Sequence, residues 1–256
     1  MKCQYKVLTL SLICSCLLFT GCISEIEPPV ETTGISLNNE QFLTISAAIQ
    51  AAKTNDIIRI GPGVYNETFS INKTLSIIGS NKNTTIFDLN KVNPSTIITV
   101  NADNCVIENF TFINSYQPHE EIEHATAIQI KSSYNEINNL KIQNFSIGIE
   151  IHNKENNYIS YTTIIAKSVG IEIWNAHKNK IKNCTVTGCE EFGIYIGQKS
   201  TYNQVYNSFF ENNDNGVRLK DAQNNMIFRN TFRNCRNNIY ECCGAKDNSI
   251  LNNDEG

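Results

Sequence analysis

The sequence predicts an all-β fold, a right-handed parallel β-helix: a single-stranded solenoid with coils of about 22 residues and a short N-terminal capping helix. Three observations predict this fold. Apolar residues recur mostly every 22 to 24 positions, glycines recur at nearly the same interval, and an asparagine comes two positions before the first apolar residue of each repeat from Ile137 onward. Asn and Ile are also the two commonest residues, which suits many short strands separated by tight turns.

Two apolar positions, five residues apart, mark the first two strands of each coil. After a first step of 30 residues, the first position recurs every 22 to 24 residues, at Ile107, Ile137, Ile159, Ile181, Val205, Ile227 and Ile250. The second position is occupied by Phe112, Ile142, Ile164, Val186, Phe210 and Phe232. Identical offsets would stack like residues in successive coils, about 4.8 Å apart, and so build a continuous core.

A recurring glycine marks the third strand, at Gly148, Gly170, Gly193 and Gly216, with Asn238 in the equivalent place of the last repeat. An alternating apolar pair follows each glycine, such as Ile149 and Ile151, and alternation places such a pair on one face of a strand. The glycine predicts either a bend with positive φ or a close approach of two backbones. The recurring asparagines predict a ladder of stacked amides, formed by Asn135, Asn157, Asn179, Asn203 and Asn225.

The N-terminal half is less regular. Residues 42–53 carry the apolar stripe of a short amphipathic helix, formed by Ile45, Ala48, Ile49 and Ala52. We expect this helix to cover the open end of the first coil, because unpaired strand backbone invites edge pairing. Strands are expected at residues 57–60, 74–78, 84–89 and 96–100, with a Gly61-Pro62-Gly63 turn after the first of them.

The first 21 residues are predicted to be a lipoprotein signal peptide. Lys2 and Lys6 flank the start of an apolar stretch, residues 7–19, that is too short to span a bilayer. The stretch runs into LFTGC, which resembles a lipoprotein box ending at Cys22, although Phe19 stands where Leu is usual; an ordinary signal peptide is the alternative. Residues 22–35 are then a flexible tether and residues 36–256 the β-helix domain. We therefore expect an exported protein, at the cell surface or in the periplasm, with Cys22 anchoring it to the membrane through a lipid.

Charge and cysteine content exclude some functions. The formal net charge of −4 argues against a strongly basic nucleic-acid-binding protein, so no nucleic-acid partner is expected. No CxxC pair follows the leader, which argues against a zinc ribbon. An exported chain can oxidise its cysteines, but their spacing does not give the pairing; beyond Cys22 they are Cys105, Cys184, Cys189, Cys235, Cys242 and Cys243.

The segment TISAAIQAAKTNDIIRIGPGVYNETFSINKTLSIIGSNKNTTIFD, residues 44–88, resembles the opening of pectate-lyase-like β-helix proteins. It is especially similar to surface and periplasmic proteins of the NosD-like type, and the resemblance covers nearly the whole chain after the leader. A NosD-like resemblance implies an association with copper-enzyme maturation. The repeats contain no Met/Cys/His cluster of the kind expected of a copper site. Because this fold hosts lyases, hydrolases and adhesins, the resemblance predicts the fold and not the activity.

The longest interruption of the repeat lies between Ile107 and Ile137, where about eight extra residues are inserted. The insertion contains His119, Glu120, Glu123 and His124, which could hold a metal ion. The alternative is a charged, solvated loop. Apart from a metal ion at this insertion, no cofactor is predicted.

Two columns of outward-facing side chains are expected on the third strand. The first contains Gln129, Glu150, Glu172, Tyr195 and Arg218, and the second, two residues further on, contains His152, Trp174, Gly197 and Lys220. Glu150 and Glu172 would lie about one strand spacing apart, roughly 4.8 Å, which approaches the carboxyl separation of retaining glycosidases. They are the catalytic candidates, with an ordinary solvated pair as the alternative. The candidate binding surface consists of His152, Trp174, Tyr195, Arg218 and Lys220.

Three functions are compatible with these features. The leading hypothesis is a non-enzymatic cell-surface module that binds a glycan or another envelope component, or serves a structural role there. The second is a carbohydrate-active enzyme, a polysaccharide lyase or glycoside hydrolase, that uses Glu150 and Glu172 or the histidine-bearing insertion. A lyase would also need an acidic calcium cluster, and Asp is sparse. The third is a copper-linked accessory protein of the NosD-like type.

Overall fold

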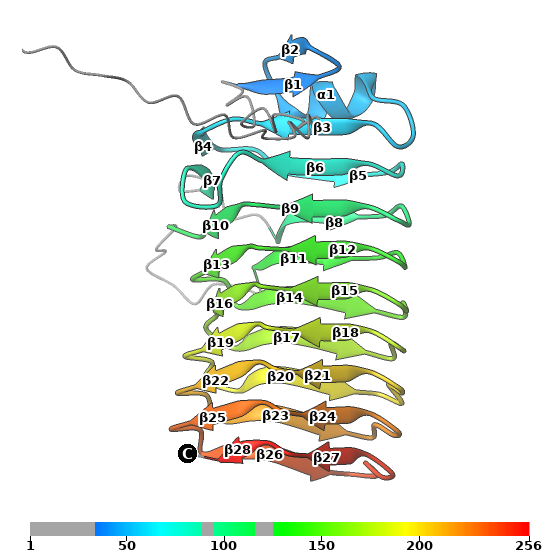
Figure 1. The fold of residues 1–256 in the computed structure, drawn as a ribbon, viewed down its shortest axis with the longest axis vertical. Helices are drawn as coiled ribbons and strands as arrows, with labels where there is room; N and C mark the ends of the chain where they lie inside the picture. Colours follow the sequence, from blue (N-terminus) through cyan, green and yellow to red (C-terminus); the bar gives the residue numbers. More distant parts are fainter. Residues whose placement is uncertain (1–33, 89–94, 116–124, 256) are drawn as a thin grey trace, which may run out of the picture. The chain divides into compact units, whose positions relative to one another are not determined.

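A computed structural model describes residues 34–88, 95–115 and 125–255, all within the compact unit Glu31–Gly256. The predicted leader, Cys22 and all but the end of the predicted tether lie outside the described residues. Figure 1 shows the described chain winding through successive coils, each of which contributes a strand to three parallel sheets. The prediction of an all-β parallel β-helix is therefore confirmed.

The three sheets, here called A, B and C, run along the stack. In spatial order, sheet A contains β2 (Glu40–Phe42), β1 (Ile35–Leu37), β3 (Ile57–Ile60), β6 (Ser76–Gly79), β9 (Val106–Glu108), β12 (Glu136–Asn138), β15 (Tyr158–Ser160), β18 (Lys180–Lys182), β21 (Gln204–Tyr206), β24 (Met226–Phe228) and β27 (Ser249–Leu251). Sheet B contains β4 (Gly63–Tyr65), β7 (Thr85–Asp88), β10 (Thr111–Ile113), β13 (Lys141–Gln143), β16 (Thr163–Ile165), β19 (Thr185–Thr187), β22 (Phe209–Glu211), β25 (Thr231–Arg233) and β28 (Asp254–Glu255). Sheet C contains β5 (Phe69–Ile71), β8 (Thr96–Val100), β11 (Thr126–Ile130), β14 (Ile147–His152), β17 (Val169–Trp174), β20 (Phe192–Gly197), β23 (Asn215–Lys220) and β26 (Asn237–Cys242).

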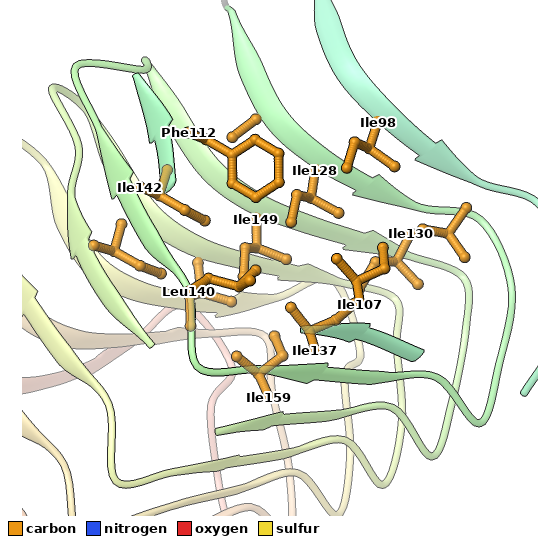
Figure 2. Close-up of a cluster of buried hydrophobic side chains, with 14 of the residues drawn as sticks. Ile98, Ile107, Phe112, Ile128, Ile130, Ile137, Leu140, Ile142, Ile149 and Ile159 are labelled. Carbon is orange, nitrogen blue, oxygen red and sulfur yellow. The ribbon is translucent and has the colours of Figure 1, made fainter. Parts of the chain in front are cut away.

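The core consists of columns of apolar side chains that point inward from all three sheets. In sheet A, Ile107 pairs with Ile137, and Ile137 pairs with Ile159, as the repeat predicts. These side chains are fully buried, and Figure 2 shows them packed against one another inside the coils. In the last described coil, Ile250 keeps the register but is 39% exposed. The repeat thus predicts both the pairing of the strands and the face that each strand buries.

The recurring glycines allow adjacent coils to approach closely. Gly148, Gly170 and Gly193 do not have positive φ, so the predicted bend is wrong. A Cβ on each would lie 2.4 to 2.5 Å from the carbonyl oxygen of the next glycine in the column, nearer than a real Cβ atom comes to another atom. The prediction of a close backbone approach is therefore confirmed, because any larger residue would push two coils apart.

The asparagine ladder is present and buried. At each step the backbone N–H and Nδ2 of one asparagine donate to Oδ1 of the asparagine in the next coil; for Asn157 and Asn179 these distances are 2.9 and 3.1 Å. The same pattern links Asn135 to Asn157 and Asn203 to Asn225. The ladder therefore satisfies turn amides that would otherwise be buried without partners.

The first coil is covered as the sequence predicts, by the helix α1 (Ile45–Ala51). The helix is shorter than the expected residues 42–53, because Thr44 caps its N-terminus by accepting from the Ala47 amide and Ala52 is already extended. It buries Ile45, Ala48 and Ile49.

A hairpin that the repeat does not predict precedes the first coil: β1 pairs antiparallel with β2 and also with β3, and so extends sheet A. Its turn is Asn38-Asn39, and both residues have positive φ. Asn-Asn between two short strands is a recognisable hairpin signal.

Candidate functional site

The outer face of sheet C carries the two predicted columns of side chains in the predicted register. Gln129, Glu150, Glu172, Tyr195 and Arg218 occupy paired positions on successive strands, and Tyr240 continues this column. The second column runs through His152, Trp174, Gly197 and Lys220 to Cys242. The candidate catalytic and binding residues therefore lie on neighbouring strands of one sheet.

Glu150 and Glu172 are joined through His152. The Nδ1 atom of His152 lies 3.0 Å from Oε1 of Glu150, and its Nε2 atom lies 3.5 Å from Oε1 of Glu172. The other oxygen of Glu150 accepts a hydrogen bond of 3.1 Å from Nε2 of Gln129. The two carboxylate side chains are only 12% and 17% exposed, so they form part of a packed polar array.

This array favours the charged form of His152. Partial burial by itself lowers the pKa of His152, but the contact with Glu172 and the negative charges of Glu150 and Glu172 outweigh this effect. The net result is a pKa above the usual histidine value. The 3.5 Å contact with Glu172 is too long for a well-formed hydrogen bond, so we regard it as an ion pair. A protonated His152 would therefore screen two carboxylates that repel each other across one strand spacing.

Beside the array, aromatic rings form a strip along sheet C. The Trp174 ring lies 6.1 Å from those of His152 and Tyr195, and the Tyr195 ring lies 5.2 Å from that of Phe192. The guanidinium of Arg218 completes the strip: it lies 5.8 Å from the Phe192 ring and 4.2 Å from the Tyr240 ring. Trp174 is 37% exposed, so its ring is accessible from outside.

A groove of about 350 Å³ lies along this strip and is lined by Ile147, Ser168, Val169, Glu172, Trp174, Glu191, Phe192, Tyr195, Arg218 and Lys220. Four of the five predicted binding residues line this groove, and the fifth, His152, contacts Trp174 and Glu172 at its edge. Of the two catalytic candidates, Glu172 lines the groove and Glu150 does not. The groove therefore combines aromatic and aliphatic surface with the carboxylates of Glu172 and Glu191 and the cationic groups of Arg218 and Lys220.

Phe192 and Glu191 also line the groove and are not among the residues predicted from the sequence. Phe192 comes directly before the recurring Gly193, in a third column of paired positions with Ile147, Val169 and Asn215. The residue before each recurring glycine could have been followed through the repeat in the same way as the other two columns.

A larger, more polar groove of about 770 Å³ lies further along the same face, where Gln50 of α1 approaches Ser70, Thr99, Gln129 and Lys131.

Within residues 34–88, 95–115 and 125–255, no group of three or more His, Cys, Asp or Glu side chains is placed to hold a metal ion. The metal candidates His119, Glu120, Glu123 and His124 lie outside the described residues, and a metal ion there stays a prediction. Among the residues that the structure covers, no helix has the length and apolarity needed to cross a membrane.

Residues 95–254 match the model of the family described as "Right handed beta helix region". The chain belongs to the right-handed β-helix family. This match also confirms the predicted handedness of the solenoid. No curated protein matches the chain. The NosD-like type and the lipoprotein form stay predictions.

Several solved structures share the fold of this β-helix protein. A pectin methylesterase in complex with a hexasaccharide has a TM-score of 0.61 and 15% identity, over 79% of this chain and 77% of that chain. The pectate lyase Pel9A has a TM-score of 0.57 and 14% identity, over 81% of this chain and 72% of that chain. The catalytic domain of a GH87 α-1,3-glucanase in complex with nigerose has a TM-score of 0.65 and 14% identity, over 78% of this chain and 40% of that chain. At these identities the similarity shows the fold alone.

Proposed function

We propose that this β-helix protein binds a glycan chain along the outer face of sheet C. We further propose that it does so as an exported protein, at the cell surface or in the periplasm, with Cys22 carrying a lipid anchor. The observation that carries the binding proposal is the groove in which Trp174, Phe192 and Tyr195 are flanked by Glu172, Glu191, Arg218 and Lys220.

The chemistry of the groove suits a sugar. One face of a pyranose ring consists largely of C–H groups and can pack on an exposed aromatic ring, while the hydroxyls at its edge need polar partners. Trp174 and Phe192 supply the apolar surface. Glu172 and Lys220 supply an acceptor and a donor at the edge of the same groove. Its volume of about 350 Å³ falls at the lower end of the range for small-molecule pockets.

The length of the face suits more than one sugar unit. The second groove, along β5, β8 and β11, lies on the same sheet as the aromatic strip and is lined mainly by hydroxyl and amide side chains. Gln129 lines this second groove and also donates to Glu150 of the polar array. An extended chain that lies across the strands of sheet C would meet both grooves. The fold relatives with a bound hexasaccharide and a bound nigerose support a carbohydrate as the class of ligand.

The contacts of the two carboxylates favour a protein that binds a glycan without cleaving it over one that hydrolyses it. Glu150 is largely buried, does not line the groove, and has both oxygens engaged, one by His152 and one by Gln129. A nucleophilic carboxylate must reach the anomeric carbon of the sugar, which these contacts prevent for Glu150. Glu172 lines the groove and lies beside a histidine, and this favours a carbohydrate-active enzyme as the second candidate.

The binding proposal is tested by screening the purified protein on a glycan array and measuring the affinity of the hits by calorimetry. Trp174→Ala is expected to weaken binding at least tenfold, because it removes the exposed ring of the groove. Met226→Ala is the matched control: Met226 has the same 37% exposure but lies on β24 of sheet A. An array without hits, or equal affinities for the wild type and Trp174→Ala, would refute the proposal.

The enzymatic candidate is tested by incubating the protein with a panel of polysaccharides and assaying reducing ends and unsaturated products. Activity that Glu172→Gln abolishes while glycan affinity is retained would establish catalysis at Glu172. Binding without any product would support the non-enzymatic function.

A further inference from the structure

The cysteines of the described residues differ in accessibility. Cys105, Cys184 and Cys189 are buried, and burial raises the pKa of Cys184 and Cys189 to about 12, so their thiols stay protonated and unreactive. Cys242 is partly exposed and Cys243 is exposed. These last two residues are adjacent in the sequence, at the end of β26.

The turn after β26 brings the two thiols together. Their sulfur atoms are 2.6 Å apart, about 0.5 Å more than the length of a disulfide bond. Cys243 and Gly244 both have positive φ, at 56° and 95°, and the Ala245 amide donates to the Cys242 carbonyl at 3.1 Å. These features define a type I′ turn with Cys243 at its first central position.

A cysteine is an unusual residue at that place in the turn. The equivalent residue of the preceding coils also has positive φ and carries an amide or a carboxylate, as in Asn153, Asn175, Gln198 and Asp221. Asn and Asp adopt this conformation at low cost because their side chains bond locally to the backbone, whereas Cys has no such advantage. The repeat therefore explains the turn, and it does not explain the cysteine.

Arg218 connects the cysteine pair to the groove. Its Nη2 atom donates to Sγ of Cys242 at 3.1 Å, while its guanidinium lies over the Tyr240 ring at 4.2 Å. The same side chain lines the groove beside Tyr195. The sulfur of Cys242 thus accepts a charge-assisted hydrogen bond, which favours its thiolate and so stabilises the reduced cysteine relative to a neutral disulfide.

We propose that Cys242 and Cys243 form a reversible vicinal disulfide, and that Arg218 stabilises the reduced form of this pair. The site is a redox site of the protein, distinct from glycan binding, and it stands whether or not a glycan binds.

The oxidation proceeds by thiol–disulfide exchange with a small disulfide such as oxidised glutathione. The thiolate of the exposed Cys243 attacks one sulfur of the reagent, which forms a mixed disulfide and releases one glutathione thiolate. The sulfur of Cys242 then attacks Sγ of Cys243, the internal S–S bond forms, and the second glutathione leaves. The two protons of the cysteine thiols end on the two glutathione molecules, and the two electrons reduce the reagent.

The bond is expected to be labile. The Cα atoms of adjacent residues are about 3.8 Å apart, whereas most disulfides join Cα atoms about 4.4 to 6.8 Å apart. A disulfide between neighbours is therefore strained, and strained disulfides are more easily reduced than structural ones.

The test uses the full chain, equilibrated with oxidised glutathione, alkylated with iodoacetamide in denaturant and digested with trypsin. Cleavage after Arg236 and Lys246 releases residues 237–246, whose only cysteines are Cys242 and Cys243. We expect this peptide to carry no alkyl group and to be lighter than its dithiol form by two hydrogen atoms; after prior reduction it should carry two alkyl groups. Two alkyl groups without reduction would overturn the proposal, as would a link to residues 234–236, which contain Cys235, or to a second copy of the peptide.

The same readout tests the lability of the disulfide and the role of Arg218 when it is followed across buffers with different ratios of reduced to oxidised glutathione. The peptide should become reduced in buffers that leave an unstrained structural disulfide intact. Arg218→Gln should require a roughly two- to tenfold higher ratio of reduced to oxidised glutathione for half-reduction, because the reduced form loses a hydrogen bond. Arg233→Gln is the control: Arg233 lies over Phe209 on sheet B, 5.5 Å from the ring centre, and should not change the midpoint. A disulfide that resists these buffers refutes the lability, and equal midpoints for both variants refute the role of Arg218.

Discussion

The asparagine ladder makes a strong prediction about stability. In Asn179→Ala, the Asn157 backbone amide loses the acceptor that it contacts at 2.9 Å, and no second partner for that amide is present in the described residues. The Asn157 side-chain amide loses its 3.1 Å bond, although it still donates to Ser132 O. Asn203 Oδ1 and Lys154 O each lose one donor.

The size of the effect follows from these four bonds. A buried backbone amide without an acceptor costs about 1 to 3 kcal/mol, and each of the other three bonds is worth about 0.5 to 1.5 kcal/mol. We therefore expect Asn179→Ala to lower the free energy of unfolding by at least about 2.5 kcal/mol, since Asn179 is fully buried.

The assay is urea unfolding, followed by circular dichroism and by fluorescence of the single tryptophan, Trp174. Coincidence of the two curves checks that the coils unfold together, which a solenoid does not guarantee. The control is Asn175→Gly. Asn175 is exposed, has a positive φ of 49° that glycine can keep, and makes one exposed side-chain bond to Asn153. Its loss should cost about 1 kcal/mol or less. A difference of less than about 1 kcal/mol between the two variants would show that the ladder does not carry the stability assigned to it.

Three further predictions concern packing and charge. Gly170→Ala should lower the free energy of unfolding by about 1 to 3 kcal/mol or more in the same assay, because the alanine Cβ would lie 2.4 Å from the Gly193 carbonyl oxygen. An unchanged urea midpoint would contradict the close approach of the coils. Phe210→Ala should lower the free energy of unfolding by about 3 to 5 kcal/mol, because Phe210 is fully buried and its ring centroid lies 5.0 Å from that of Phe232. A decrease below about 1 kcal/mol would mean that the surrounding side chains move in to fill the cavity. The stabilising contribution of protonated His152 should be fully present below the unfolded pKa, about 6.5, and lost as the pH rises through the raised folded pKa. The stability difference between wild type and His152→Gln should shrink over that range, and an NMR titration of His152 with a pKa below 6.5 would refute the assignment.

Much of the fold could be predicted because a β-helix repeats one local pattern. Two residues with the same offset in successive repeats must pair across adjacent coils, so the spacing of Ile107, Ile137 and Ile159 gives the register of sheet A directly. Alternation along each strand then gives the buried face. The same rule places the catalytic candidates Glu150 and Glu172, and binding candidates such as Trp174, on one outer face.

The rule does not extend to features outside the repeat. The β1–β2 hairpin occurs once, and so no neighbouring repeat reveals its register. Phe192 does lie in a repeated column. The residue type in that column changes from aliphatic to aromatic to amide, so the sequence pattern does not reveal that these positions belong to one column.

The sequence alone determined the solenoid, its register, the inward and outward faces, and which residues share sheet C, because these follow from backbone periodicity. Only the tertiary structure decided that His152 lies between Glu150 and Glu172, that Trp174, Phe192 and Tyr195 line one groove, and that Arg218 reaches both the groove and Cys242. These contacts depend on side-chain rotamers and on burial by neighbours in adjacent coils. Backbone periodicity fixes the position of each side chain along the sheet, and the neighbouring coils fix what that side chain touches.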